Sequence, residues 1–208
     1  MNIQEVYNNI SSDFSHTRHS VWNAVKEFLK GLPSQSLLGD IGCGNGKNML
    51  YRSDLVCQGI DYSEQLVGIC KQRGLDVLYG SILNIPFRDS CFDNTICIAV
   101  IHHLEERVER LRAIRELVRV TKPSGKILIS VWALKQDEDS KRKFTTNDVL
   151  VPFRVRDGSS SGSVYERFYH VYNDGELEED IRCIDNCKFR TERIFYEKGN
   201  WYAILVKE

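Results

Sequence analysis

The segment Asp40-Ile-Gly42-Cys-Gly44-Asn-Gly46 leaves an apolar, strand-like run at residues 36–41 and opens what the pattern predicts as a helix. Glycines at such a bend allow the backbone to turn tightly and to approach a ligand where a Cβ would collide. The segment departs from the dinucleotide fingerprint G-x-G-x-x-G, because its third glycine comes one residue early and an acid precedes the first. Since Asp40 would repel a phosphate, the loop favours a cationic or zwitterionic ligand.

Strand-like and helix-like runs alternate around this loop over about 100 residues, which indicates βαβ units and a doubly wound α/β fold. We expect a mainly parallel sheet of seven strands, closed by an antiparallel C-terminal pair. The predicted strands of the sheet span residues 36–41, 56–60, 77–79, 92–100, 126–134, 188–196 and 201–206. The predicted helices span residues 64–73, 105–121 and 176–186, and regular structure also covers 167–172.

The two remaining parts of the chain are expected to belong to the same single domain, residues 1–208. Apolar side chains in residues 1–31 recur at helical spacing, so this part is predicted to be a helical cover. Residues 135–163 lose the hydrophobic period and contain the run Gly158-Ser-Ser-Ser-Gly162-Ser. We predict a long loop there, which is either mobile or ordered only with a partner.

Composition limits the class of protein. The chain has 28 Lys and Arg against 29 Asp and Glu, a net charge of −1, so a positive field over the whole surface is excluded. No apolar run reaches membrane-helix length and the N-terminus has no signal-peptide pattern, so we expect a soluble protein of the cytoplasm, or also the nucleus. Seven cysteines without a dense framework suit a reducing compartment. Cys183 and Cys187 lack a second pair at zinc spacing, so no metal is expected.

A second acid, Asp61, ends the next predicted strand. Its carboxylate matches two neighbouring hydroxyls of a ribose, and this position is where such folds bind ribose. The alternative is that Asp61 caps the following helix, but Ser63 can already do so. We therefore favour a ribose contact.

Together the loop and Asp61 resemble the class I S-adenosylmethionine-dependent methyltransferases over residues 36–134. The resemblance implies that Asp40 and the loop backbone hold the methionine end of the cofactor and that Asp61 holds its ribose. Ser81 stands where many members have an acid for the adenine, and the Ile82 N–H would bond the ring instead. The implied cofactor contacts are Tyr7, Arg18, Asp40, Gly42, Cys43, Gly44, Asp61, Tyr62, Ser81, Ile82 and Ala99.

A narrower resemblance is to the transfer RNA methyltransferases that esterify 5-carboxymethyluridine at the wobble position, uridine 34. The stretches that carry it are Val6–Ile10, Phe14–Arg18, Asp40–Lys47, Ile98–His103, Val131–Leu134 and Phe168–Tyr172 with Gly175–Leu177. The resemblance implies methyl transfer to a nucleotide carboxylate in the anticodon loop. It also implies a heterodimer with a small zinc-binding activator subunit.

An ionised carboxylate needs no proton removed, so the acceptor site should offer a cation or hydrogen-bond donors rather than a general base. Arg18 could hold the carboxylate of either the cofactor or the substrate. The candidate acceptor-side residues are His103, Trp132, Tyr169 and His170. Of these, His103 follows the fourth strand, and Trp132 could stack on the uracil or simply pack in the core.

Two groups of basic residues are candidates for RNA contacts. Residues 107–126 hold seven basic and two acidic residues, which also fits a solvated helix face; residues 141–156 hold five and one. The second group lies in the predicted loop and is the better candidate for phosphate contacts. The edge of the sheet at residues 75–79 could accept a strand from the activator.

Two rival functions stay open on the sequence. The first is an enzyme of the same fold that acts on a small carboxylic acid or a protein. The second is a non-catalytic binding module, against which the intact Asp40, glycines and Asp61 argue.

Overall fold

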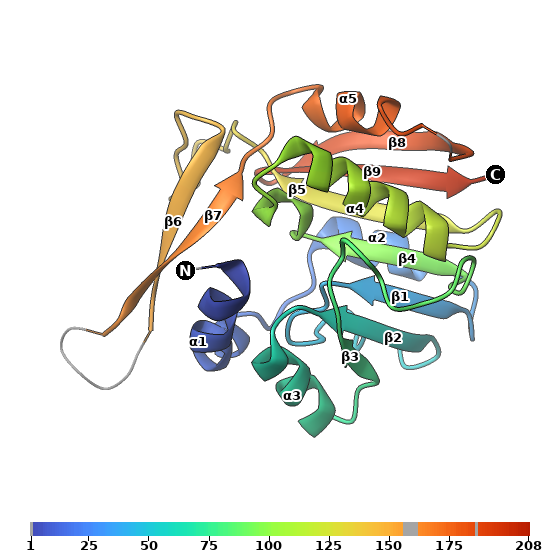
Figure 1. Cartoon of the computed structure of the whole chain (residues 1–208), viewed down its shortest axis with the longest axis horizontal. Helices are drawn as coiled ribbons and strands as arrows, with labels where there is room; N and C mark the ends of the chain where they lie inside the picture. Colours follow the sequence, from blue (N-terminus) through green and yellow to red (C-terminus); the bar gives the residue numbers. More distant parts are fainter. Residues whose placement is uncertain (1, 156–161, 186) are drawn as a thin grey trace.

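The computed structural model describes residues 2–155, 162–185 and 187–208. A seven-stranded sheet with the order β3-β2-β1-β4-β5-β9-β8 forms its centre (Figure 1). The strands are β1 (Leu37–Ile41), β2 (Val56–Asp61), β3 (Val77–Tyr79), β4 (Asn94–Ile98), β5 (Lys126–Trp132), β8 (Phe189–Glu197) and β9 (Asn200–Lys207). The first five are parallel, while β9 pairs antiparallel with both β5 and β8. This confirms the predicted doubly wound sheet and its antiparallel C-terminal pair.

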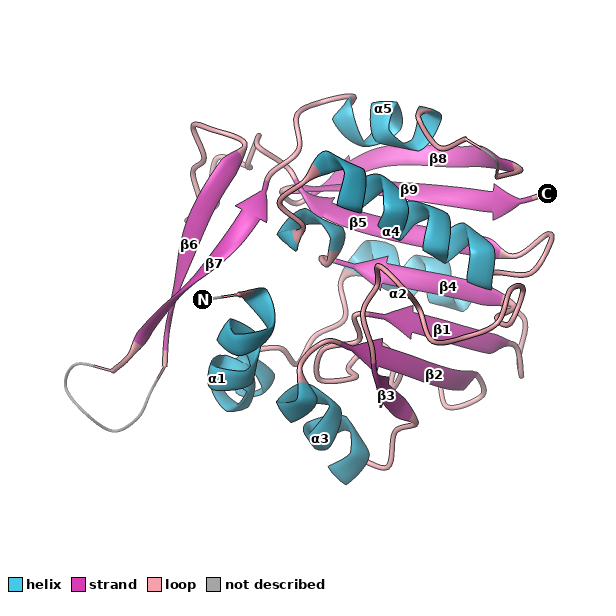
Figure 2. Cartoon of the chain, viewed as in Figure 1, coloured by secondary structure: helices cyan, strands magenta, loops and turns pink. Residues whose placement is uncertain are grey.

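The direction in which strands are added reverses between β1 and β4, and ligands of such sheets bind at the carboxyl ends beside that point. Helices cover both faces of the sheet (Figure 2). They are α1 (Ile3–His16), α2 (Asn23–Lys30), α3 (Glu64–Gln72), α4 (Arg107–Val120) and α5 (Glu176–Arg182), with a 3₁₀ turn η1 at Ile101–His103. Among the described residues no helix is long and apolar enough to cross a membrane.

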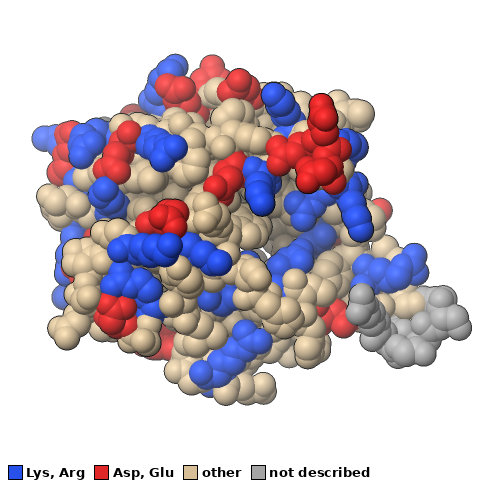
Figure 3. Space-filling view, turned by 180° about the vertical axis from the view of Figure 1, so that it is seen from behind, with Lys and Arg blue, Asp and Glu red and all other residues tan. Residues whose placement is uncertain are grey.

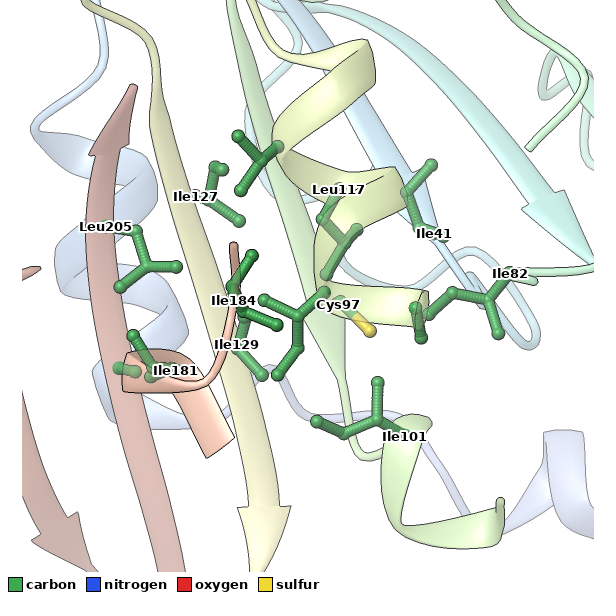
Figure 4. Close-up of a cluster of buried hydrophobic side chains, with 14 of the residues drawn as sticks. Ile41, Ile82, Cys97, Ile101, Leu117, Ile127, Ile129, Ile181, Ile184 and Leu205 are labelled. Atoms are coloured by element: carbon green, nitrogen blue, oxygen red, sulfur yellow. The ribbon is translucent and has the colours of Figure 1, made fainter. Parts of the chain in front are cut away.

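The core is two apolar layers, one on each face of the sheet. In one layer Leu117 of α4 and Ile181 of α5 pack against Ile127 and Ile129 of β5 (Figure 4). In the other, α2 packs against strand residues that include Leu128. Neighbouring residues of β5 thus supply opposite layers, which explains why this strand reads as a continuous apolar run.

Strands β6 (Asp148–Arg154) and β7 (Val164–His170) form an antiparallel hairpin that stands apart from the main sheet (Figure 1). The prediction of an irregular loop over residues 135–163 is therefore wrong for 148–154. Every second residue of β6 is exposed, so the strand has only one buried side. Pro152 also weakens a strand pattern, although a two-stranded ribbon tolerates proline. Residues 158–161 of the predicted flexible run lie outside the described residues.

The helix expected directly after Gly46 is also absent, because the chain makes only a few turns there before β2. The Leu50 N–H donates to the Gly46 carbonyl at 3.3 Å, which closes a single helical turn. Arg52 then donates to the carbonyls of Leu29 and Leu32 at the end of α2 and anchors the chain away from a helical path.

Candidate active site and cofactor cavity

A cavity of about 900 Å³ lies at the carboxyl ends of the parallel strands, and α1 and β7 contribute to its wall. Its size falls within the range of ligand sites. Nearly all predicted site residues line it. They are Tyr7, Arg18, Gly42, Cys43, Gly44, Asp61, Tyr62, Ser81, Ile82, Ala99, His103, Trp132 and Tyr169. Asp40 and His170 do not.

The glycine loop needs glycine for two reasons. Gly42 has a φ of +78° and Gly44 a φ of +58°, values that side chains with a Cβ rarely adopt. A Cβ on Gly42 would also stand 2.3 Å from Val100. The loop is held down because the N–H groups of Gly42 and Cys43 both donate to the Ile60 carbonyl.

Asp61 connects the loop to the next helix. Its Oδ2 accepts from the Gly44 N–H at 2.8 Å and its Oδ1 accepts from the Ser63 N–H at 2.9 Å. Ser63, not Asp61, caps α3, because its Oγ accepts from the Leu66 N–H. Burial raises the pKa of Asp61. Asp61 lines the cavity, so a ribose contact remains compatible with this geometry.

Asp40 lies behind the loop, fully buried, and neither carboxylate oxygen has a hydrogen-bond partner in the described part of the chain. Burial raises the pKa of Asp40 to about 7, and the charge of Lys47 acts in the opposite direction. The structure thus corrects the prediction of direct ligand contact. Asp40 can act on a cation through its electric field but not through direct contact.

Helix α1 closes the cavity over the loop. The Tyr7 hydroxyl lies 2.9 Å from Nε2 of His103, and the Tyr7 ring makes an edge contact with Phe14. The Arg18 guanidinium lies 5.2 Å from the centre of the Phe14 ring. The backbone carbonyl of Arg18 accepts a hydrogen bond from the side chain of Asn45 in the glycine loop. Arg18 therefore belongs to the loop side of the cavity.

The hydrogen bonds of His103 settle its protonation state. Its Nδ1 lies 2.8 Å from the Phe168 carbonyl, which can only accept, so Nδ1 carries the proton. Nε2 then accepts from the Tyr7 hydroxyl. Burial lowers the pKa of His103 to about 3, so the ring is neutral at physiological pH. His103 lines the cavity as predicted, but it holds Tyr7 and Phe168 in place and supplies no cation.

Trp132 and Tyr169 form a stacked pair with ring centres 4.1 Å apart and planes 13° from parallel. The Arg142 guanidinium lies 3.9 Å from the centre of the Trp132 ring. A uracil could therefore stack on Trp132, as predicted, only by displacing Arg142. Both arginines of this region, Arg142 and Arg167, line the cavity, and neither was among the site residues predicted from the sequence.

The His170 side chain is bonded to two carboxylates outside the cavity, so its predicted place in the pocket is wrong. Its Nδ1 lies 2.7 Å from Asp148 and its Nε2 2.5 Å from Glu176. Neighbouring side chains of a strand point to opposite faces, so with Tyr169 toward the cavity, His170 faces away. Burial alone would lower the pKa of His170, but the two carboxylates raise it.

The remaining part of the cavity fits an adenine and a sulfonium. Ser81 accepts from the Leu83 N–H in its own turn, while the Ile82 N–H has no acceptor in the described ranges. Ala99 follows β4 with a φ of +59°. Gly42 has no Cβ to block a ligand, and Asp61 lines the same cavity. Together these residues fit S-adenosylmethionine.

Comparisons with known proteins agree with this geometry. Residues 39–129 match the family described as a methyltransferase domain. The tRNA (carboxymethyluridine(34)-5-O)-methyltransferase of Schizosaccharomyces pombe is 33% identical over 99% of this chain and 96% of its own length. The Xenopus tropicalis tRNA (carboxymethyluridine(34)-5-O)-methyltransferase alkbh8 is 33% identical over 99% of this chain and 40% of its own length. The chain thus spans less than half the length of such vertebrate relatives.

A solved structure has the same fold. It belongs to the complex between the Haloferax volcanii Trm112 methyltransferase activator and a methyltransferase, and it matches with a TM-score of 0.67 at 14% identity, over 99% of this chain and 97% of that chain. The full-length match to the yeast relative decides the assignment. The chain belongs to the family of tRNA (carboxymethyluridine(34)-5-O)-methyltransferases.

Proposed function

We propose that this protein uses S-adenosylmethionine to convert the carboxylate of 5-carboxymethyluridine, at position 34 of tRNA, into its methyl ester. The observation that carries the proposal is the division of the cavity. The glycine loop and Asp61 lie on one side, and Arg142, Arg167 and the Trp132–Tyr169 pair lie on the other. Membership of the family supports the same reaction.

When bound, S-adenosylmethionine supplies a methyl group on a positively charged sulfur. A carboxylate acceptor is ionised near pH 7, so no side chain has to remove a proton from it. The two histidines after β4 agree with this requirement, because Nδ1 of His102 accepts from the Trp132 N–H and Nε2 of His103 accepts from Tyr7. Neither lone pair is free to act as a base. The residues of the chain align the reactants and exclude water.

The proposal includes a small zinc-binding activator subunit on one of the two edges of the sheet, the edge formed by β3. Strand β3 lies at that edge, and its Leu78 and Tyr79 are 39% and 45% exposed. An exposed edge strand can pair with a strand of a partner. The Haloferax volcanii complex supports a partner of this kind. Co-purification with the activator, lost on replacing Leu78 and Tyr79 by charged residues, would support the heterodimer.

Labelled S-adenosylmethionine and tRNA that lacks the methyl ester test the function directly, with and without the activator. The expected result is label in one nucleoside at position 34, identified by mass spectrometry and released as methanol by mild alkali, as an ester requires. Label transferred instead to a small acid or a protein would favour the first rival function. Cofactor binding that calorimetry cannot detect would favour a non-catalytic module.

A further inference from the structure

Arg167 on β7 is a buried cation without a counter-ion. It is 4% exposed and lines the cavity, yet its Nε has no hydrogen-bond partner and its guanidinium forms no ion pair with any described residue. A buried charge in this state is costly unless something pairs with it. The cost is explained if an anion enters the cavity and pairs with Arg167.

Aromatic rings position Arg167 and a second arginine, the exposed Arg142, without neutralising them. The Arg167 guanidinium lies 5.1 Å from the centre of the Phe153 ring and 5.3 Å from that of Tyr169. Tyr169 stacks on Trp132, and Arg142 lies over Trp132. Cation–π contacts thus hold Arg142 at the Trp132 ring and Arg167 at the Tyr169 ring, and they leave the N–H groups of both side chains free for a ligand.

Other donors around these rings lack acceptors as well. Nδ1 of His102 accepts from the Trp132 backbone, so in the neutral ring Nε2 must carry the proton. That Nε2 and Nε1 of Trp132 are both buried without a partner in the described part of the chain. Carboxylates also line the cavity, at Glu105, Glu106, Glu109 and Glu166, but none pairs with Arg142 or Arg167.

We infer that Arg142 and Arg167 form a clamp that holds the carboxylate of the acceptor nucleotide; this deepens the proposed function and rests on it. The planar fork of arginine matches a carboxylate. Arg18 and Lys47 stand at the glycine loop, where the cofactor's own carboxylate would lie, since the Arg18 carbonyl binds Asn45 and Lys47 donates to the Ser20 carbonyl. Arg142 and Arg167 stand beyond β4 and β5, on the acceptor side.

The clamp also distinguishes substrate from product. Transfer of the methyl group turns the carboxylate into a neutral ester, so the clamp loses its anion when the reaction is complete. A phosphate of the RNA backbone would keep its charge and would not change in this way. Figure 3 views the molecule from behind and shows Lys and Arg atoms in and beside the hollow on the right-hand side. Acidic atoms also lie there.

Binding measurements with two anticodon stem-loops distinguish a nucleotide carboxylate from a backbone phosphate as the ligand of the clamp. One carries 5-carboxymethyluridine at position 34 and the other its neutral carbamoylmethyl analogue, and both are titrated with S-adenosylhomocysteine present. We expect the full chain, with its activator if needed, to bind the carboxylate RNA about tenfold or more tightly than the amide RNA. Arg167→Gln and Arg142→Gln should each lose most of that preference, with the amide RNA and the cofactor bound as before.

Lys143→Gln is the matched control, because Lys143 is an exposed basic residue next to Arg142 that does not line the cavity. It should weaken both RNAs equally. Equal weakening of both RNAs by Arg167→Gln would instead assign Arg167 to phosphate, and weaker cofactor binding would assign it to the cofactor; either result overturns the clamp. If the wild type bound with the expected preference but transferred no methyl group, the proposed function would fail while the clamp survived.

Thermal unfolding tests whether the replacement of Arg167 acts by disturbing the fold. Because Arg167 is an unpaired buried charge, Arg167→Met should raise the Tm of the ligand-free protein by about 2–4 °C. A merely structural arginine would give a lower Tm when replaced, and that result would count against the clamp.

Discussion

At the scale of residues, the two acids of the crevice have different surroundings and so different tasks. Asp61 accepts from two backbone N–H groups and borders the cavity. Asp40 has no partner among the described residues and lies behind the loop. Their positions in sequence, each at the end of a strand, made them look alike. Asp61 supplies a hydrogen-bonded support for a ligand, whereas Asp40, with a pKa of about 7, acts only through the charge of its ionised form.

Asp40 makes stability depend on pH. Its folded pKa of about 7 lies above the ordinary 3.8, so the folded protein holds this proton more tightly than the unfolded chain does. The free energy of unfolding should therefore fall, by roughly 2–4 kcal/mol from this group, as the pH rises from about 4 to 7. Urea unfolding of Asp40→Asn should show a flatter profile over that window. Parallel profiles for the variant and the wild type would show that Asp40 ionises normally.

Asp61→Ala should raise the dissociation constant of S-adenosylmethionine by about 10- to 100-fold, because the ribose loses a charged acceptor. Ser63→Ala is the control. It removes the cap of α3, which should cost about 1 kcal/mol of stability, but leaves Asp61 in place. Calorimetry would decide, and a loss of affinity as large in Ser63→Ala as in Asp61→Ala would mean that the helix, not the acid, matters.

At the scale of elements, the wall of the acceptor side is built from segments that only the fold brings together. The strands of the main sheet and α3 to α5 were predictable because apolar spacing and caps such as Ser63 are local signals. The hairpin was not, since β6 is exposed at every second residue and contains Pro152. Arg167 and Arg142 carry no motif, and what marks them is the absence of a counter-ion, which appears only once β7 and the segment after β5 meet at Trp132.

Tyr7 and His103 join α1 to η1, and His103 in turn joins η1 to β7 through Phe168. Tyr7→Phe and His103→Ala should each lower turnover. Because both remove the same hydrogen bond, the double variant should be little worse than His103→Ala alone. A double-mutant cycle on kcat/KM measures this, and strictly additive losses would show that the two side chains act independently.

At the scale of the whole molecule, the two basic segments differ in what surrounds them. On α4 and just after it, most of the basic residues pair with acids, including Arg107 with Asp180 and Arg119 with Glu116. The segment from Lys141 to Lys143 makes no ion pair to any described residue. This supports the reading of α4 as a solvated face and leaves the segment after β5 as the place where tRNA phosphates are expected.

Lys141→Glu should therefore weaken tRNA binding several-fold and reduce its salt dependence, because a phosphate contact is lost. Arg112→Glu, an equal charge change at an exposed position of α4, should leave affinity nearly unaltered. Filter binding at several salt concentrations compares the two. A larger effect of Arg112→Glu would place the RNA on the opposite basic segment.

The place of β9 between β5 and β8 has a consequence for biosynthesis. After the ribosome has translated the parallel strands, β5 has no outer neighbour until residues 200–207 are made, because these residues form the strand that pairs with it. The nascent chain thus exposes the unpaired, apolar edge of β5 until residues 200–207 emerge. We expect a chaperone that acts during translation to bind this edge.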